Sequence, residues 1–141
     1  AKLADSLRRE LLSRGESFVF ETVFSDPAGD KLAFLKDARR AGYTVLLCYI
    51  GIATAEISEE RVAIRVSQGG HDVPAEKLKA RFPRTLANLK AAIRELPHVQ
   101  IYDNSDLRHP FRHIAAFRDG RMVYRSKAAP EWFEALRSNS R

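Results

Sequence analysis

Cysteine, tryptophan and methionine each occur once in this 141-residue chain. The lone Cys48 cannot form an internal disulfide, and its position inside the apolar run Val45–Ile50 predicts a small core residue. That run is the longest apolar stretch and is only long enough for a strand, which argues against a membrane-spanning helix. Residues 1–14 carry charges throughout and lack the apolar centre of a signal peptide. We therefore expect a cytoplasmic protein that does not enter a membrane.

The histidines are also too scattered for metal or nucleophilic chemistry. His71 stands in a glycine-rich turn beside Asp72, without the cluster of His, Cys and Glu side chains that a metal site requires. His98, His109 and His113 form no Ser/His/Asp or Cys/His arrangement that spacing alone would reveal. We expect a structural role for His71 and no metal site in this sequence.

Charge, by contrast, is abundant and localised. The chain has the length and the apolar content, 45%, of one globular domain spanning residues 1–141. Its net charge is +6, with a pI near 9.8. Between Arg61 and Lys90 there are seven Lys or Arg residues against only Asp72 and Glu76, an excess of five that nearly equals the imbalance of the whole chain. The basic character is therefore that of one segment.

The arginines of this segment are spaced to share helix faces. Arg61 and Arg65 are four residues apart, and Arg81 and Arg84 are three apart, so each pair projects from one side of a helix. No carboxylate stands at the neighbouring helical positions to offset their mutual repulsion. Guanidinium groups bind phosphate oxygens in pairs, which makes a phosphate the fitting partner. The alternative interpretation is a solvated helix face whose partners come from elsewhere in the fold.

Helical and strand patterns alternate along the chain, as in an α/β protein. Apolar spacing predicts helices, and runs of β-branched or aromatic residues predict strands. Gly69-Gly70 separates two basic helices and predicts a hairpin-like excursion, and Asp119-Gly120 predicts a β-hairpin. The expected helices are 1–14, 27–41 with Pro27 in its first turn, 55–67, 75–96 and a short one from Pro130. The expected strands are 17–24, 43–51, 99–104 and the two arms of the hairpin within 112–126. We expect a parallel sheet flanked by helices, with strand 43–51 covered on both faces.

Two polar groups follow or end predicted strands, at the sheet edge where ligands bind in open α/β folds. Glu21 and Thr22 lie near the end of the first predicted strand, 17–24. A carboxylate among apolar residues there needs a partner or a function. It could equally pair with a nearby arginine or cap a helix. Asp103 and Asn104 follow the strand near residue 100, and they could form a simple turn or contact a ligand.

Three segments of the chain resemble the zeta-toxin group of P-loop kinases. They are SFVFETVFS at 17–25, RVAIRVSQGGHDVPAEKLKARFPRTLANL at 61–89 and IYDNS at 101–105. The resemblance extends from the first helix to the C-terminal hairpin. It implies a P-loop kinase-like α/β core, a helical lid at about 61–89, and ATP and Mg²⁺ as cofactors. Some members of the group phosphorylate UDP-N-acetylglucosamine, and many others have no assigned substrate. The resemblance implies a small-molecule acceptor, and an acidic antitoxin would suit the basic face.

The resemblance also assigns roles to residues. Arg65, Arg81 and Arg84 would be lid arginines that act on the ATP phosphates during catalysis. Arg61 would assist them in nucleotide binding. Glu21 and Thr22 would line the acceptor pocket, and Asp103 and Asn104 would lie near the adenine.

One motif of that group is missing here. The sequence contains no G-x-x-x-x-G-K-[ST] loop, whose amides and lysine hold the phosphates of ATP and whose hydroxyl binds Mg²⁺. Gly29-Asp30-Lys31 lacks both the earlier glycine and the Ser or Thr. We therefore expect this chain to be the C-terminal portion of a longer kinase, inactive in isolation and prone to self-association or to pairing with the missing segment.

Two other functions remain open from the sequence. A non-catalytic basic module could bind nucleic acid, although Phe82 is the one aromatic among the arginines and base stacking has little support. A degenerate relative could survive as a protein-binding module. Neither the phosphate acceptor nor the oligomeric state follows from the sequence.

Overall fold

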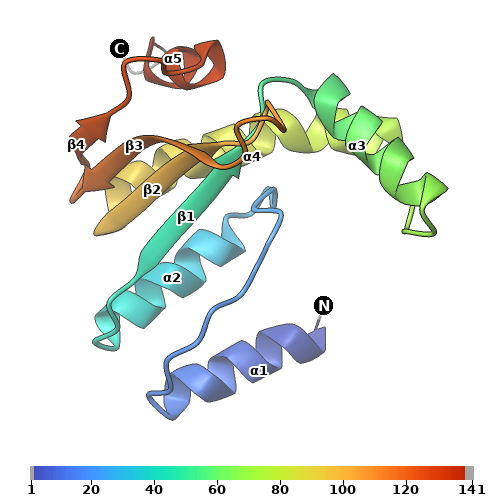
Figure 1. Ribbon diagram of the computed structural model, residues 1–141. Helices are drawn as coiled ribbons and strands as arrows, with labels where there is room; N and C mark the ends of the chain where they lie inside the picture. Colours follow the sequence, from blue (N-terminus) through green and yellow to red (C-terminus); the bar gives the residue numbers. More distant parts are fainter. Residues whose placement is uncertain (1, 139–141) are drawn as a thin grey trace.

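The computed structural model describes residues 2–138 and places within them one four-stranded sheet and five helices (Figure 1). The strands are β1 Leu46–Gly51, β2 His98–Asp103, β3 Arg112–Arg118 and β4 Arg121–Arg125, in that spatial order. β1 is parallel to β2, but β2 with β3 and β3 with β4 are antiparallel. The α/β class is confirmed and the purely parallel sheet is wrong. The connections 104–111 and 119–120 are too short for the crossover that parallel neighbours require.

The helices agree with the predicted ones. They are α1 Lys2–Ser13, α2 Asp30–Arg40, α3 Ala55–Ser67, α4 Ala75–Glu95 and α5 Glu131–Ser138. The difference lies at the start of α2, which follows Gly29 rather than including Pro27 in its first turn. A turn joins Gly29 N to the Asp26 carbonyl at 3.4 Å, and the Asp26 carboxylate accepts a hydrogen bond from Lys31 N at 3.3 Å. The helix therefore begins only where this turn ends. No helix within residues 2–138 combines the length and the apolar composition of a membrane span.

The predicted hairpin is present between β3 and β4. Asp119 and Gly120 have φ angles of 48° and 77°, the left-handed conformation that a tight two-residue hairpin turn requires at both central positions. Their Asp-Gly sequence accounts for this turn because both residue types tolerate positive φ.

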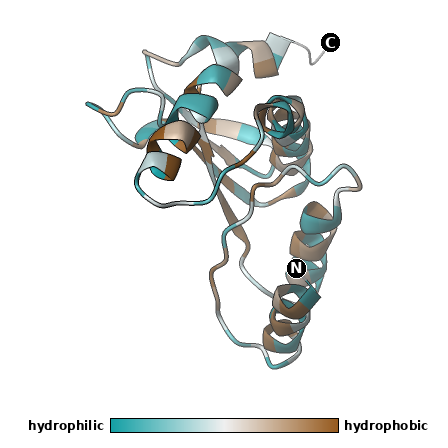
Figure 2. Cartoon of the chain, turned by 90° about the vertical axis from the view of Figure 1, so that its right-hand side faces the viewer, coloured by the Kyte–Doolittle hydropathy of each residue, from teal (hydrophilic) through white to brown (hydrophobic). Residues whose placement is uncertain are grey.

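The core lies between the sheet and the helices α4 and α5. Val99, Ile101 and Asp103 of β2 are buried, while the alternate residues of the strand are only half-buried. Figure 2 shows the hydrophobic colour on the strands at the centre of the molecule. The most deeply buried apolar side chains are Leu89, Ala92, Leu96, Val99, Ile101, Ile114, Ala115 and Phe133.

The predicted strand at 17–24 is wrong. Residues 16–26 run without helix or strand assignment, because they form no ladder with β1 or with any other strand in the described part of the chain. Phe18 and Phe20 instead pack on Phe34 of α2, with ring centroids 6.3 and 5.9 Å away. Val19 is 96% exposed on the opposite side. The alternating aromatic residues of this segment therefore pack their side chains on α2 without forming a strand.

β1 is also less covered than its apolar sequence predicts. It is an edge strand that pairs only with β2. Leu47 and Tyr49 are half-buried, whereas Leu46 and Ile50 are 57% and 53% exposed. Cys48 lies on the exposed side with them, so its predicted place in the core is wrong. Alternation along a strand sends these side chains to the face that α4 and α5 do not cover.

Helix α1 stands apart from the sheet in both ribbon views (Figures 1 and 2). It has no buried residue, and its side chains Leu3 and Leu7 are 84% and 58% exposed. The helix is held by Leu12, which packs against the core, and by polar contacts. The Tyr43 hydroxyl donates to the Leu11 carbonyl at 3.1 Å, and the Asp5 carboxylate pairs with Lys31 of α2 at 3.0 Å.

Candidate functional site

A cleft of about 610 Å³ runs along β1 and is lined by residues of α3 and α4. One wall is the extended segment 21–24, the floor is β1, and the other walls come from α3 and α4. Its lining residues are Glu21, Thr22, Val23, Phe24, Leu47, Cys48, Tyr49, Ile50, Gly51, Ile52, Ser58, Arg61, Val62, Arg65, Val73, Leu78, Arg81, Phe82 and Thr85. Five of the eight predicted site residues are therefore brought to one place, namely Glu21, Thr22, Arg61, Arg65 and Arg81.

Local sequence signals set where α3 begins and where it ends. The Thr54 hydroxyl caps α3 by accepting a hydrogen bond from Ile57 N at 3.3 Å. The helix ends at Ser67; Gly69 follows with a φ of 87°, and Gly70 N donates back to the Arg65 carbonyl at 2.9 Å. Figure 1 shows α3 and this turn projecting away from the sheet before the chain returns along α4. Lys79 and Glu59 join the two helices with an ion pair of 3.7 Å. The predicted excursion is confirmed.

Gly70 has a direct effect on an arginine. A Cβ placed on Gly70 would lie 2.5 Å from Cγ of Arg65 and 2.9 Å from its carbonyl oxygen. Both distances are shorter than carbon and oxygen atoms tolerate. Only glycine at this position allows the stem of Arg65 to lie across the turn.

The four predicted arginines differ in their surroundings. Arg61 donates from Nη2 to the Ser105 carbonyl at 3.0 Å. The guanidinium groups of Arg65, Arg81 and Arg84 make no hydrogen bond or ion pair to residues 2–138. Arg65 and Arg81 line the cleft, whereas Arg84 is exposed and does not. The cleft therefore carries two cationic groups that lack an internal counter-charge, and a third that is held by a neutral carbonyl.

The segment that bears Glu21 and Thr22 has a fixed shape. The Thr22 hydroxyl accepts a hydrogen bond from Phe24 N at 3.2 Å, and Phe24 is buried with φ of 59°. Asn88 of α4 donates from Nδ2 to the carbonyls of Phe24 and Asp26, at 2.9 and 3.0 Å. A residue of the long lid helix thus holds the wall of the cleft in place. Glu21 itself is exposed on that wall.

Two uncharged residues of the floor were missed by the sequence analysis. Tyr49 packs against Trp132, with ring centroids 6.1 Å apart. Burial raises the pKa of the Tyr49 phenol above its ordinary value, and the nearby Thr85 hydroxyl opposes that shift. The phenol therefore stays neutral at physiological pH. Cys48 also lines the cleft. Because side chains alternate between the two faces of a strand, the sequence could have placed Tyr49 and Cys48 on opposite faces of β1.

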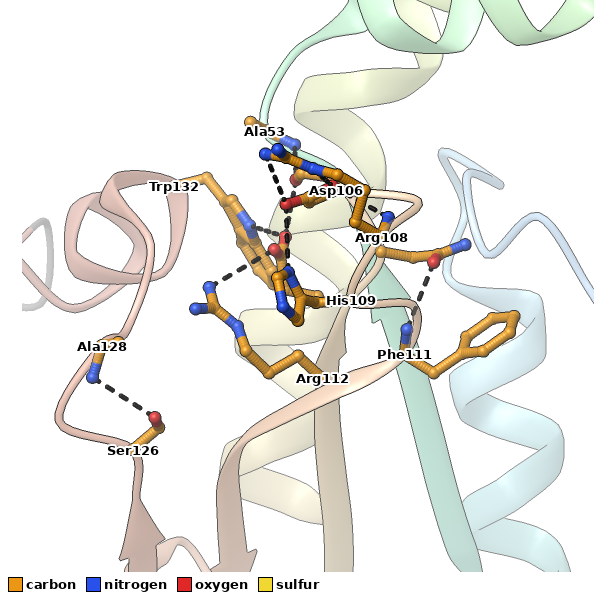
Figure 3. Close-up of polar contacts among 12 residues, drawn as sticks. Ala53, Asp106, Arg108, His109, Phe111, Arg112, Ser126, Ala128 and Trp132 are labelled. Carbon is orange, nitrogen blue, oxygen red and sulfur yellow. Dashed lines mark hydrogen bonds and ion pairs between the residues drawn. The ribbon is translucent and has the colours of Figure 1, made fainter.

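Asp103 and Asn104 lie outside the cleft lining. The Asp103 carboxylate is 5% exposed; its Oδ1 accepts hydrogen bonds from Trp132 Nε1 at 2.9 Å and from Ser105 Oγ at 2.7 Å. Arg112 is 3.6 Å from its second oxygen. Asn104 accepts from Phe111 N at 3.2 Å through its side chain (Figure 3). Both residues are thus engaged with other parts of the chain.

The loop that follows Asn104 is organised by Asp106. Its carboxylate accepts hydrogen bonds from the side chain and the backbone of Arg108, at 3.2 and 2.9 Å, and lies 3.2 Å from His109 (Figure 3). The Arg108 hydrogen bonds hold the pKa of Asp106 well below its ordinary range. These contacts are exposed, so they shape the loop more than they stabilise the fold.

The charge of the cleft lining is suited to an anion. In the described part of the chain, no group of three or more His, Cys, Asp or Glu residues could hold a metal ion. Convergent guanidinium groups beside a carboxylate and a hydroxyl suit a phosphate-bearing ligand next to a polar acceptor.

An α/β sheet with helices on its covered face and an arginine-bearing helical excursion is consistent with the P-loop kinase-like class. The family model of the zeta toxins matches residues 1–113, and the chain belongs to that family. No curated protein and no solved structure matches it. Membership places the chain among kinase-like phosphotransferases that use a nucleotide. The match ends early in β3, so β4 and α5 lie outside it.

Proposed function

We propose that this protein is an ATP-dependent phosphotransferase domain of the zeta-toxin type. It would transfer the γ-phosphate of ATP to a small-molecule acceptor. The observation that carries this proposal is the convergence of Arg61, Arg65 and Arg81 on a cleft whose opposite wall presents Glu21 and Thr22. Phosphate groups and an acceptor hydroxyl would then face one another within one cleft.

The lid arginines would stabilise charge on the transferred group. In phosphoryl transfer the charge spreads over the equatorial oxygens, and fixed guanidinium groups lower its energy in a cleft that excludes water. Arg65 and Arg81 line the cleft directly. Arg84 lies one helical turn beyond Arg81 on α4, and it would join them if the lid closes.

The remaining residues divide between acceptor and nucleotide. Glu21 and Thr22 would bind the hydroxyl groups of the acceptor, with a UDP-N-acetyl sugar as the first candidate. Arg61 would bind a nucleotide phosphate. The loop that begins at Asp103 and Asn104 would flank the adenine, with the buried Asp103 carboxylate supporting the loop.

No residue of this sequence supplies the G-x-x-x-x-G-K-[ST] loop, and the described residues contain no metal-ligand cluster. We therefore assign no step to Mg²⁺ and restrict the roles to binding, positioning and charge stabilisation by this chain's own side chains. We further propose that residues 1–141 act as one domain in the cytoplasm, with an acidic antitoxin or a second copy as protein partner.

Phosphate transfer from γ-labelled ATP tests the proposal. The assay uses the protein as its native gene expresses it and a panel of small acceptors that includes UDP-N-acetylglucosamine. We expect one acceptor to be labelled, and Arg81→Ala to lower kcat about 100-fold or more, as the loss of a transition-state arginine does. Arg94→Ala is the matched control, because Arg94 is exposed on the same helix and outside the cleft. Absence of transfer, together with RNA binding that falls steeply with salt, would instead indicate a basic binding module.

A further inference from the structure

Ser105 is bonded to α3 at two separate points. Its hydroxyl accepts a hydrogen bond from Ala53 N at 2.8 Å, directly before the Thr54 cap. Its carbonyl accepts from Arg61 Nη2 at 3.0 Å, about two turns further along the helix. One residue of the loop after β2 therefore holds both the entry to the lid helix and the first arginine of the cleft.

The position of Ser105 is in turn fixed by Asp103. Ser105 Oγ donates to Asp103 Oδ1 at 2.7 Å, and the same oxygen accepts from Trp132 Nε1 at 2.9 Å (Figure 3). Asp103 is the one charged residue that is buried within residues 2–138. A buried carboxylate is costly unless its oxygens are hydrogen-bonded, so these two donors are coupled to each other through it.

Trp132 is seated by the end of β1. A Cβ on Gly51 would lie 2.4 Å from the indole ring, so only glycine leaves room for the ring at this point. Trp132 belongs to α5, which is outside the part of the chain that the zeta toxin family model matches. A helix outside the matched segment is thus hydrogen-bonded to the residue that positions the loop contacting α3.

The hydrogen bond to Ser105 preorganises the Arg61 side chain for binding an anion. A free arginine side chain must be ordered when it binds an anion, and this ordering has an entropic cost. Arg61 already has one nitrogen bound to the Ser105 carbonyl, while its other donors remain available to a ligand. Arg65 and Arg81 have no such restraint among the described residues.

We propose that Ser105 is a positioning residue for Arg61, held by Asp103 and by Trp132 of α5, so that the C-terminal helix sets the affinity of the cleft for phosphate groups. The proposal rests on the anion-binding role of the cleft in the proposed function. It predicts that the contribution of Ser105 to anion affinity exists only while Arg61 is present.

A double-mutant cycle with inorganic tripolyphosphate tests this coupling. Isothermal titration calorimetry at one fixed salt concentration gives the Kd of the full chain and of its Ser105→Ala, Arg61→Ala and doubly substituted forms. We expect Ser105→Ala to weaken binding about 3- to 10-fold in the parent chain, and to change it less than about 2-fold in the Arg61→Ala background. Ser105→Thr keeps the hydroxyl and should restore the parent affinity. Ser13→Ala, an exposed serine of α1, is the control.

The outcomes separate this proposal from the proposed function. If Arg61→Ala, Arg65→Ala and Arg81→Ala all leave the Kd unchanged, the anion-binding cleft itself is wrong. If Arg61→Ala weakens binding but Ser105→Ala has the same effect with and without Arg61, the cleft stands and the positioning role is wrong. Should Ser105→Ala fail to fold, the cycle is made with Trp132→Phe and Arg61→Ala, and the same two outcomes decide.

Discussion

The indole nitrogen of Trp132 lies 2.9 Å from a carboxylate oxygen of Asp103, in a part of the core where Asp103 is 5% exposed. The two residues are 29 positions apart in the sequence. Their contact attaches α5 to the end of β2, at the edge of the sheet from which the lid departs. It thereby joins the last helix of the chain to the loop whose Ser105 contacts Arg61 of α3.

Removing the indole donor should destabilise the protein. Trp132→Phe leaves the buried Asp103 carboxylate with one donor fewer, which costs about 1–3 kcal/mol of unfolding free energy. Equilibrium urea denaturation measures the loss. The same substitution in an Asp103→Ala background, which lacks the acceptor oxygen, separates the hydrogen bond from the ring volume. An equal loss in both backgrounds would show that only the volume of the ring matters.

The arginines that line the cleft should contribute more to polyanion binding than arginines outside it. Arg65→Ala and Arg81→Ala each remove a guanidinium that faces the cleft without an internal partner, so we expect the Kd for tripolyphosphate to rise about 5- to 20-fold. Arg94→Ala should leave it nearly unchanged. Calorimetry at two salt concentrations provides the measurement. A similar loss for all three variants would mean that overall charge, and not the cleft, attracts the anion.

Arg84 provides a separate test of lid closure. It is exposed and does not line the cleft, so Arg84→Ala should change tripolyphosphate affinity less than Arg81→Ala does. If the lid closes over ATP, the same substitution should still lower kcat in the transfer assay. An unchanged kcat would remove Arg84 from the catalytic set.

The two glycines of the lid turn should respond differently to alanine. At Gly69 a Cβ has no neighbour within 4 Å, but φ is 87°, so Gly69→Ala should destabilise by about 1 kcal/mol through backbone strain alone. At Gly70 the Cβ would collide with Arg65. We expect Gly70→Ala to shift the Arg65 side chain and to weaken tripolyphosphate binding, which Gly69→Ala should not do. Urea denaturation and calorimetry on both variants check the two effects, and equal affinities would contradict the proposed contact.

Acid should weaken the attachment of α1 to α2. The hydrogen bond from Lys31, followed by that from Arg8, holds the pKa of Asp5 below its ordinary value. Because the folded-state pKa is the lower one, this contribution is present above the ordinary carboxyl pKa and is lost as pH falls through the depressed value. NMR titration of the Asp5 carboxyl in Lys31→Ala should show its pKa moving back up. Faster amide exchange in α1 should accompany the change, and an unmoved pKa would contradict the ion pair.

Cys48 should react without unfolding. Its side chain is exposed on β1 and lines the cleft. Ellman's reagent should therefore titrate one thiol per chain in native buffer, at a rate that low urea concentrations do not accelerate. A reaction that requires global unfolding would restore the core position predicted from the apolar run. Saturating tripolyphosphate should slow the labelling if the anion occupies the same cleft.

Local sequence signals were sufficient for much of this molecule. The Gly69-Gly70 pair ends α3 and permits the turn, and Asp119-Gly120 forms the hairpin, because each conformation depends on the φ angles of adjacent residues. The spacing of Arg61 with Arg65 and of Arg81 with Arg84 predicted an anion site, and three of these four arginines line one cleft. The predicted strand at 17–24 was wrong because a strand depends on distant residues. The composition of this segment suits a strand, but a strand exists only where a partner supplies the ladder hydrogen bonds.

The sequence by itself determined the α/β class, the helices, the hairpin and the concentration of arginine in one excursion, since all of these follow from short-range periodicity and turn chemistry. Tertiary structure alone decided that Cys48 is exposed and that Arg84 lies outside the cleft. It also decided that Asp103 accepts hydrogen bonds from Trp132 and Ser105. Each of these depends on which distant segments pack together, and contact between residues far apart in the chain leaves no periodic trace in the sequence.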